Sequence, residues 1–387
     1  MSTRQDKRFS SMRVVILSIL IVILFFLPAS SNLDSYWQIF REAFSLIQQR
    51  YIEPVPEDKI LEGAIEGVLG SLDENSYILS SLDSTKENPL LIEEVGILLS
   101  RGKDGWQVVT PLVNSPAWRA GIRPGDKLGK IDDQEMSIVN ATPLIKKLSG
   151  SLPSKVSLTF VRQEETQKYT LNRQIFQPKI IYEREETIGY IRIIEYPGTF
   201  AKEFEGILFQ FQKEKIKGLI LDLRNNPGCM YSPAGEMASQ VLSYFLPAGK
   251  MIAYTQGRTA SRGQKFSTSK EPVFPTLPLV ILVNQGTAGI SEIIAGALKD
   301  YKRATLVGVR TYGNASESSN FPLEDGNILH LTVADYYTPQ GRLIRETGVS
   351  PDREIIIPLE LELKIMKGEK ISDPQRDEAF STLRGQQ

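Results

Sequence analysis

Residues 284–300 read NQGTAGISEIIAGALKD, a glycine-punctuated turn followed by small and apolar residues at helical spacing. This layout is typical of a loop that presents a reactive group at the start of a helix. The residue at the tip is Gly289, which has no side chain to present. Ser291 follows, directly before Glu292, and is open to two interpretations. It is a reactive serine, or it caps the helix by accepting from a free backbone amide, which is the favoured interpretation.

The chain around this stretch alternates buried apolar runs with amphipathic segments. Such an order predicts an α/β layered domain whose functional loops gather at the carboxyl ends of the strands. A charged tail from about residue 360 is expected to lie outside the core. The predicted strands are IGYIRIIEY (188–196), GLILDLRNN (218–226), LPLVILVNQ (277–285), ATLVGVRTYG (304–313) and NILHLTVADYY (327–337).

Residues 34–171, which precede this region, show a different pattern of apolar and polar residues. Residues 34–72 carry apolar side chains at three- and four-residue steps, which predicts two amphipathic helices. Residues 73–90 are polar and rich in turn formers, so they are expected to form a linker. From residue 91 to about residue 171, short alternating runs separated by glycine turns predict a small β domain interrupted by one helix, ATPLIKKLSG (141–150).

Composition excludes several classes of site. The 387 residues include 45 basic and 46 acidic side chains, so no net field attracts nucleic acid. One cysteine and one histidine cannot build a disulfide framework or a zinc cluster, and no metal or cofactor is expected. The histidine, His330, lies in an alternating apolar run and is predicted to be a structural strand residue.

The N-terminus predicts export. Basic residues precede an apolar run over 14–27, and small residues follow it. The run is shorter than the 20 or so residues of a full membrane span, so residues 1–31 are predicted to be a signal peptide or, equally, an uncleaved signal anchor. The chain is therefore expected to be extracytoplasmic, either secreted or attached to the membrane through this segment.

The β region resembles a PDZ domain. SPAWRAGIRPGDKLGKID (115–132) matches the central pattern of that family, and residues 142–148 fit its groove helix. Val95, Gly96, Ile97 and Leu98 occupy the place of the carboxylate-binding loop. The resemblance implies that an extended peptide or protein C-terminus adds a strand to an open sheet edge beside this loop.

The α/β region resembles the C-terminal processing peptidases, or tail-specific serine proteases. GLILDLRNNPGCM (218–230), VNQGTAGISEIIAGALKD (283–300), VADYYTPQGRLI (333–344) and GVSPD (348–352) match motifs of that family in order. The resemblance implies an α/β catalytic-type core with a ClpP/crotonase-like layered sheet and helices, an inserted PDZ domain and an N-terminal helical cap. The implied boundaries are 1–31 for the signal segment, 34–87 for the cap and linker, 88–175 for the PDZ domain, 176–358 for the core and 359–387 for the tail.

Three chemical positions of that family are substituted here. Its nucleophilic serine corresponds to Gly289, its general-base lysine, 25 residues later, to Asn314, and an assisting glutamine to Ser318. The aspartate at the helix end is retained as Asp300, which suits a role in fixing the helix and the loop. The oxyanion loop of the family corresponds to Gly228 and Cys229.

Loss of both the nucleophile and the base predicts a pseudopeptidase that binds peptides as a scaffold or regulator. The alternative is an active serine endopeptidase that cuts near C-termini with a rearranged site, for which Ser291 is the candidate nucleophile. Cys229 is the other conceivable nucleophile, although a neutral buried thiol is favoured. The expected partners are unstructured polypeptides, protein C-termini, and a second copy or an active relative.

Overall fold

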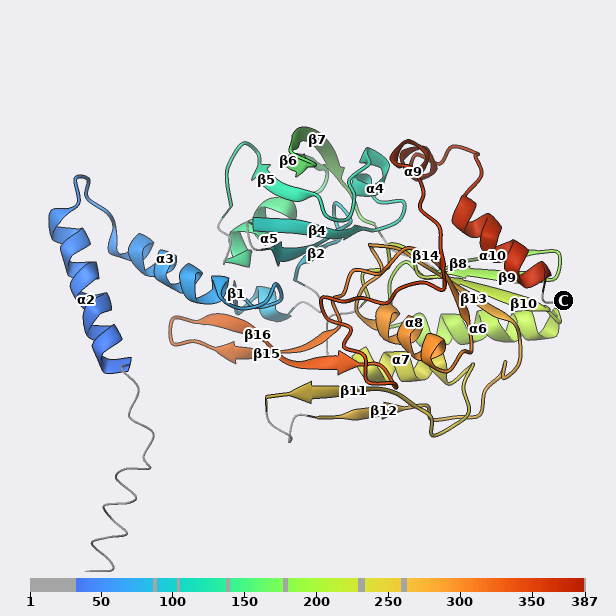
Figure 1. Cartoon of the computed structure of the whole chain (residues 1–387). Helices are drawn as coiled ribbons and strands as arrows, with labels where there is room; N and C mark the ends of the chain where they lie inside the picture. Colours follow the sequence, from blue (N-terminus) through green and yellow to red (C-terminus); the bar gives the residue numbers. More distant parts are fainter. Residues whose placement is uncertain are drawn as a thin grey trace, which may run out of the picture. The chain divides into compact units, whose positions relative to one another are not determined.

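The computed structural model describes residues 33–85, 89–102, 105–136, 140–176, 180–228, 234–258 and 263–385. The expected signal segment and Cys229 lie outside these described residues. The chain divides into two compact units, residues 1–67 and residues 68–387 (Figure 1).

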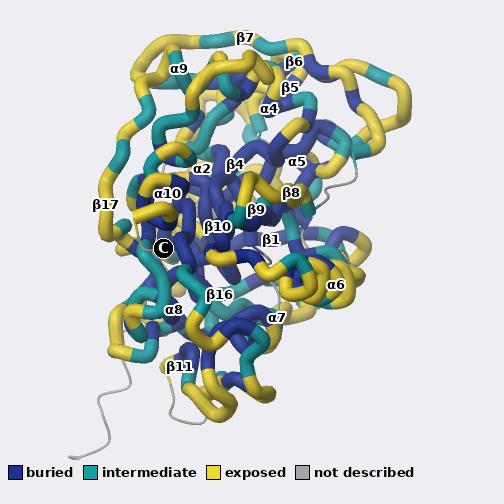
Figure 2. Tube along the Cα trace, turned by 90° about the vertical axis from the view of Figure 1, so that its right-hand side faces the viewer, coloured by how far each residue is buried: buried dark blue, intermediate teal, exposed yellow. Residues whose placement is uncertain are grey.

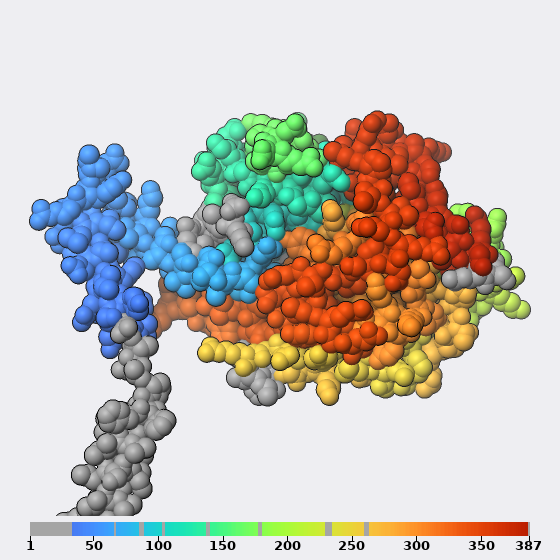
Figure 3. Space-filling view, viewed as in Figure 1, coloured from blue at the N-terminus to red at the C-terminus, as the bar shows by residue number. Residues whose placement is uncertain are grey.

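Two amphipathic helices make up the described part of the first unit. No residue of the first helix is buried, and apolar side chains such as those of Trp37 and Ile39 are exposed. This helix belongs to the blue part of the space-filling view in Figure 3. Among the residues that the structure describes, no helix combines the length and apolar character that a membrane crossing needs. The helices are α2 (Leu33–Arg50) and α3 (Glu57–Gly70), the second of which continues into the second unit.

A six-stranded sheet in the order β17-β14-β13-β10-β9-β8 forms the centre of the second unit. All neighbouring pairs are parallel except β8 with β9. Strands covered on both faces read as continuous apolar runs, and β10 and β13 are buried along their whole length. The strands are β8 (Ile181–Glu185), β9 (Ile188–Arg192), β10 (Gly218–Asp222), β13 (Leu279–Val283), β14 (Thr305–Gly308) and β17 (Arg353–Glu354).

Helices cover both faces of this sheet. Leu219 and Leu221 of β10 pack into one apolar cluster with α6 (Phe200–Lys213), α7 (Ala234–Leu242) and α8 (Ile290–Asp300). Ile220 points to the other face and packs with α10 (Pro374–Arg384). Strands β9 and β10 are accordingly dark blue in Figure 2. The tail expected to lie outside the core therefore contributes a covering helix, because Phe380 and Leu383 are buried against the sheet.

A second sheet of the core has the order β1-β16-β11-β12, with β15 also paired to β16. The predicted linker over residues 73–90 is wrong in part, because it contains β1 and a 3-10 helix, η1, and β1 pairs antiparallel with β16. His330 of β16 lies opposite Tyr77 and stacks on its ring at 4.8 Å between centroids. Burial lowers the pKa of His330 to about 4, in keeping with a structural residue. The elements are β1 (Tyr77–Ser80), η1 (Asp83–Thr85), β11 (Met251–Gly257), β12 (Lys265–Ser267), β15 (Ser316–Pro322) and β16 (Asn327–Tyr337).

The third sheet, in the order β2-β3-β4-β5-β6-β7, is antiparallel throughout. Two helices accompany it rather than the one predicted, because Ser115 caps an additional short helix by accepting from the amide of Trp118. The elements are β2 (Leu91–Ile92), β3 (Ile97–Gly102), β4 (Gly105–Pro111), α4 (Pro116–Ala120), β5 (Lys127–Ile131), α5 (Ala141–Leu148), β6 (Ser154–Arg162) and β7 (Glu165–Arg173), with α9 (Leu359–Met366) further along the chain.

Candidate active site and peptide groove

Three loops meet at one edge of the parallel sheet. They follow β10, β13 and β14, which are neighbours in the sheet, so their carboxyl ends lie side by side. The amide of Ala288 donates to the carbonyl of Asn226, and the amide of Tyr312 donates to the carbonyl of Thr287, both at 3.0 Å. The loop after β13 is therefore fixed to the loops on either side of it.

Gly289 lies at the centre of this arrangement and precedes α8 as its N-cap residue. Its backbone has φ 55° and ψ −122°, a conformation that residues with a side chain adopt only at a cost. The turn therefore has the sharp strand-to-helix geometry of a loop that presents a side chain, while the residue in it has none.

The structure contradicts the prediction that Ser291 caps the helix. Ser291 is the second residue of α8, and its hydroxyl lies 2.8 Å from the hydroxyl of Tyr196. The serine is fully buried. Burial raises the pKa of Tyr196, so its phenol stays protonated and is no base for the serine.

Glu292, which sequence reasoning did not single out as a site residue, joins the loops at the two positions predicted to be substituted. Its carboxylate is fully buried and accepts from the amides of Gly289, Gly313 and Asn314, at 3.2, 2.7 and 2.7 Å. The hydroxyl of Thr311 also donates to it. Burial raises the pKa of Glu292 to about 7 and these hydrogen bonds oppose the rise. The capping-box spacing of Glu292 at the third helical position was the available signal.

Asn314, at the position predicted to correspond to the base, is buried and held by a second amide. The side-chain nitrogen of Asn75 donates to the side-chain oxygen of Asn314 at 2.6 Å and to the hydroxyl of Ser316 at 3.1 Å. Ser318 lies two residues further along β15, beyond a register shift, and is half-buried. The segment before β1 thus reaches the site, which its turn-rich composition did not indicate.

Gly228 packs directly against the turn at Gly289. A Cβ on Gly228 would lie 2.4 Å from the carbonyl oxygen of Ala288 and 2.7 Å from the amide nitrogen of Ile290. With φ at +66°, the position requires glycine. The amide of Gly228 donates to the side-chain oxygen of Asn226 at 2.7 Å. Gly228 of the predicted oxyanion loop therefore lies beside the predicted nucleophile position, and its amide already has a partner.

Asp300 closes the far end of α8. Its carboxylate accepts from the amide of Gln340 at 2.8 Å and pairs with Arg342. These contacts join the helix end to the loop after β16, in line with the fixing role predicted from its position.

Tyr312 connects this edge of the sheet to the β domain. Its hydroxyl lies 2.8 Å from the hydroxyl of Ser100 on β3, and Gln107 of β4 donates to it, also at 2.8 Å. Glu74, which precedes β1, accepts from the same hydroxyl and from Gln107. Burial raises the pKa of Tyr312, so the hydroxyl remains a donor.

The predicted peptide-binding loop over residues 95–98 is buried along its whole length. A Cβ on Gly96 would lie 2.1 Å from the Cβ of Ser115, which explains the glycine. The open sheet edge expected beside this loop is closed, because β2 pairs antiparallel along β3 with Leu91 opposite Leu98. A peptide can add a strand there only after β2 leaves.

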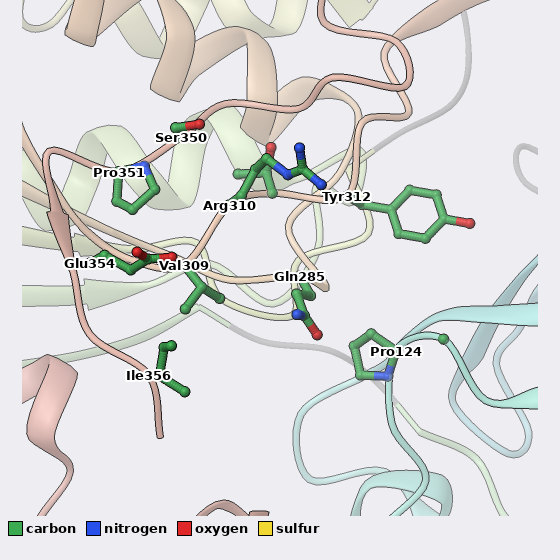
Figure 4. Close-up of a pocket in the computed structure, with 11 residues that line it drawn as sticks. Pro124, Gln285, Val309, Arg310, Tyr312, Ser350, Pro351, Glu354 and Ile356 are labelled. Carbon is green, nitrogen blue, oxygen red and sulfur yellow. The ribbon is translucent and has the colours of Figure 1, made fainter. Parts of the chain in front are cut away.

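Two pockets adjoin the loop that contains Tyr312. One, of about 480 Å³, includes Asn75 and Asn314 in its wall. The other, of about 740 Å³, lies at the carboxyl ends of β13 and β14, where Gln285, Val309 and Arg310 line it (Figure 4). Clefts at this edge of a parallel sheet are the usual location of ligand sites.

These elements define an α/β peptidase-type core joined to a PDZ-type β domain. Residues 187–355 match peptidase family S41, residues 107–162 match a PDZ domain, and residues 28–78 match the N-terminal domain of the activating protease CtpB. The chain belongs to the carboxy-terminal processing proteases of peptidase family S41.

Two relatives support this assignment over most of their length. The carboxy-terminal-processing protease of Bartonella bacilliformis is 30% identical over 355 residues, which cover 88% of this chain and 80% of the relative. The carboxyl-terminal-processing protease of Synechocystis is 32% identical over 349 residues, which cover 86% and 78%. The solved structure of a photosystem II D1 C-terminal processing protease matches 85% of this chain and 97% of its own with a TM-score of 0.66 at 24% identity, which shows the shared fold.

Proposed function

We propose that this chain is an exported pseudopeptidase that binds extended peptides or protein C-termini as a scaffold or regulator. The observation that carries the proposal is the pair of substitutions Gly289 and Asn314, both held in place by one carboxylate, that of Glu292. The loops are thus ordered for chemistry that their side chains do not perform.

The chemical argument rests on what the two residues lack. Glycine supplies no nucleophile, and a carboxamide has no basic lone pair at neutral pH, so neither half of a serine-lysine dyad is available. The side-chain oxygen of Asn314 accepts a hydrogen bond from Asn75, so it acts as a structural acceptor and not as a base. Removing either member of a catalytic dyad abolishes most of the rate enhancement.

Ser291 does not replace the missing nucleophile. Its hydroxyl meets a tyrosine whose burial keeps it protonated, so no proton acceptor is supplied by that contact. The serine is also fully buried inside α8, where a substrate carbonyl has no approach. An active endopeptidase acting through Ser291 would require this packing to open.

Cleavage of casein by the purified full chain tests the proposal, with fragments followed by gel electrophoresis. We expect no cleavage by the wild type or by Ser291→Ala, and cleavage by the double variant Gly289→Ser with Asn314→Lys. The single variant Gly289→Ser is the matched control, because it has a nucleophile without a base. Cleavage by the wild type that Ser291→Ala abolishes would overturn the proposal.

The remaining expectations on location and assembly belong to the same proposal. Residues 1–31 export the chain and are removed or retained as an anchor, which N-terminal sequencing of the mature protein distinguishes. A second copy or an active relative is the partner that the family resemblance implies, and light scattering of the purified chain, alone and mixed with a relative, measures it.

A further inference from the structure

β3 is the strand to which a peptide would add. The backbone hydrogen-bonding groups on its outer edge are already paired with other segments of the same chain. The amide of Leu99 donates to the carbonyl of Leu90 at 3.1 Å, and the amide of Arg101 donates to the carbonyl of Glu74 at 3.2 Å. Ile97 is paired with Ile92 in the same ladder. The other edge of β3 is paired with β4 along its length.

The segment on the outer edge has the geometry of a bound peptide. Leu90, Leu91 and Ile92 run antiparallel to β3 towards the loop at residues 93–96. The carbonyl oxygen of Ile92 accepts from the amide of Gly96 at 2.8 Å. This places the Ile92 carbonyl where a backbone loop of this kind holds the terminal carboxylate of a peptide.

The side chains of this segment are buried as those of a ligand would be. Leu90 and Ile92 are 1% and 2% exposed and lie in one apolar cluster with Leu144, Ile145 and Leu148 of α5. Alternate side chains of an added strand enter pockets on the same face, so Leu90 and Ile92 point to one side of the strand. The groove is therefore lined for apolar residues.

We propose that Leu90–Ile92 is an internal occupant of the peptide groove, and that the external ligand is a polypeptide C-terminus with apolar final residues that displaces it. This inference rests on the proposed peptide-binding function. An internal segment competes at a high effective concentration, and a groove that is open in only a minor fraction of molecules binds its ligand correspondingly weakly. Releasing the segment should strengthen binding of an external C-terminus by at least about tenfold.

A peptide-binding assay on the full chain tests this inference. The probe is a fluorescein-labelled peptide with the sequence KENPLLI, which repeats residues 86–92, with a free carboxyl end. Fluorescence anisotropy gives its Kd for the wild type, for Ile92→Asp and for the control Glu93→Ala, which changes an exposed side chain in the same turn. Carboxamide and KENPLDD versions of the probe test the need for a free and apolar C-terminus.

We expect Ile92→Asp to bind the free-acid probe at least about tenfold more tightly than the wild type and Glu93→Ala do, and both altered probes to bind weakly. Equal affinity of Ile92→Asp and the wild type overturns the inference and leaves the peptide-binding function standing. Absence of binding by every protein, each folded by its melting curve, overturns both.

A reversible lock covers the case in which Ile92→Asp fails to fold. Leu91 and Leu98 face each other in a pair flanked by the hydrogen-bonded pair of Leu90 with Leu99, which suits a cross-strand disulfide. In a Cys229→Ser background, Leu91→Cys with Leu98→Cys should lose probe binding on oxidation and regain it on reduction. Unchanged binding in the oxidised protein contradicts the inference.

Discussion

Replacing Glu292 by glutamine tests how the loops of the site are held. One carboxylate oxygen accepts from the amide of Gly313 and the hydroxyl of Thr311, and the other accepts from the amides of Gly289 and Asn314. Glutamine keeps one oxygen and turns the other into a donor. If the NH₂ group faces Gly289 and Asn314, two buried amide donors lose their acceptor. If it faces Gly313 and Thr311, the Thr311 hydroxyl can turn to accept from it, and only the amide of Gly313 loses its acceptor.

The size of the effect follows from these contacts. A buried donor left without its acceptor costs about 1–3 kcal/mol, so one or two such donors cost about 1–6 kcal/mol. For a folding unit of this size, about 2–4 °C of melting temperature corresponds to each kcal/mol. We expect Glu292→Gln to melt about 2–24 °C below the wild type.

Differential scanning fluorimetry in one buffer at about pH 8.5 measures this shift, because the Glu292 carboxyl, with its pKa of about 7, is ionised there. Glu324→Gln is the matched control, because Glu324 is exposed and the same change of charge there should leave the melting temperature within about 1 °C. If Glu292→Gln also melts within about 1 °C of the wild type, Glu292 does not join the loops and the reasoning fails.

Three further predictions concern stability, and the first of them compares the pH dependence of two variants. In Glu292→Gln, stability should rise by up to about 3 kcal/mol as pH rises from 4 to 6.5, because native His330 has a pKa of about 4 against its usual 6.5 and the unfolded chain binds the extra proton. In His330→Gln, stability should instead fall as pH rises from 4.5 to 7, because native Glu292 keeps its proton up to about 7. Urea midpoints measured across this pH range give the slope of stability against pH for each variant, and equal slopes in the two variants would contradict the prediction. Gly289→Ala should lower the free energy of unfolding by about 1–3 kcal/mol, because alanine is strained at the positive φ of this position. The control Gly63→Ala, where a Cβ meets open space on α3, should not destabilise the chain. Equal melting temperatures for Gly289→Ala and the wild type would exclude strain at the turn. Arg101→Met should cost at least about 3 kcal/mol, because the guanidinium donates to the carbonyls of four residues before β1, and an unchanged urea midpoint would refute this.

Local patterns predicted the α/β core well. Continuous apolar runs such as residues 279–283 belong to parallel strands covered on both faces, and they lie where the sequence indicates. The charged tail was misread because α10 buries only one stripe of side chains, including Phe380, so its mean composition is polar. The strand β1 was missed because it is four residues long and lies between turn formers.

In the candidate site, too, local sequence patterns predicted part of the arrangement and long-range contacts supply the rest. The motif spacing indicated that Gly289 and Asn314 share one site, and the structure joins their loops through Glu292. Long-range partners were beyond the reach of local patterns: Asn75 contacts Asn314 across 239 positions, and Tyr196 contacts Ser291 across 95. The pairing that closes the edge of β3 could not be predicted either, because β2 has only two residues and so shows no alternation of apolar and polar residues.

Covalent labelling with a fluorophosphonate tests the central claim most directly, because the reagent reacts with activated serines whatever the substrate. Intact-mass spectrometry of the purified wild type should show no adduct, while Gly289→Ser with Asn314→Lys should gain one, placed at position 289 by peptide mapping. A single adduct on the wild type that maps to Ser291 and disappears in Ser291→Ala would contradict the account, because it would show an active serine in a site described as lacking one.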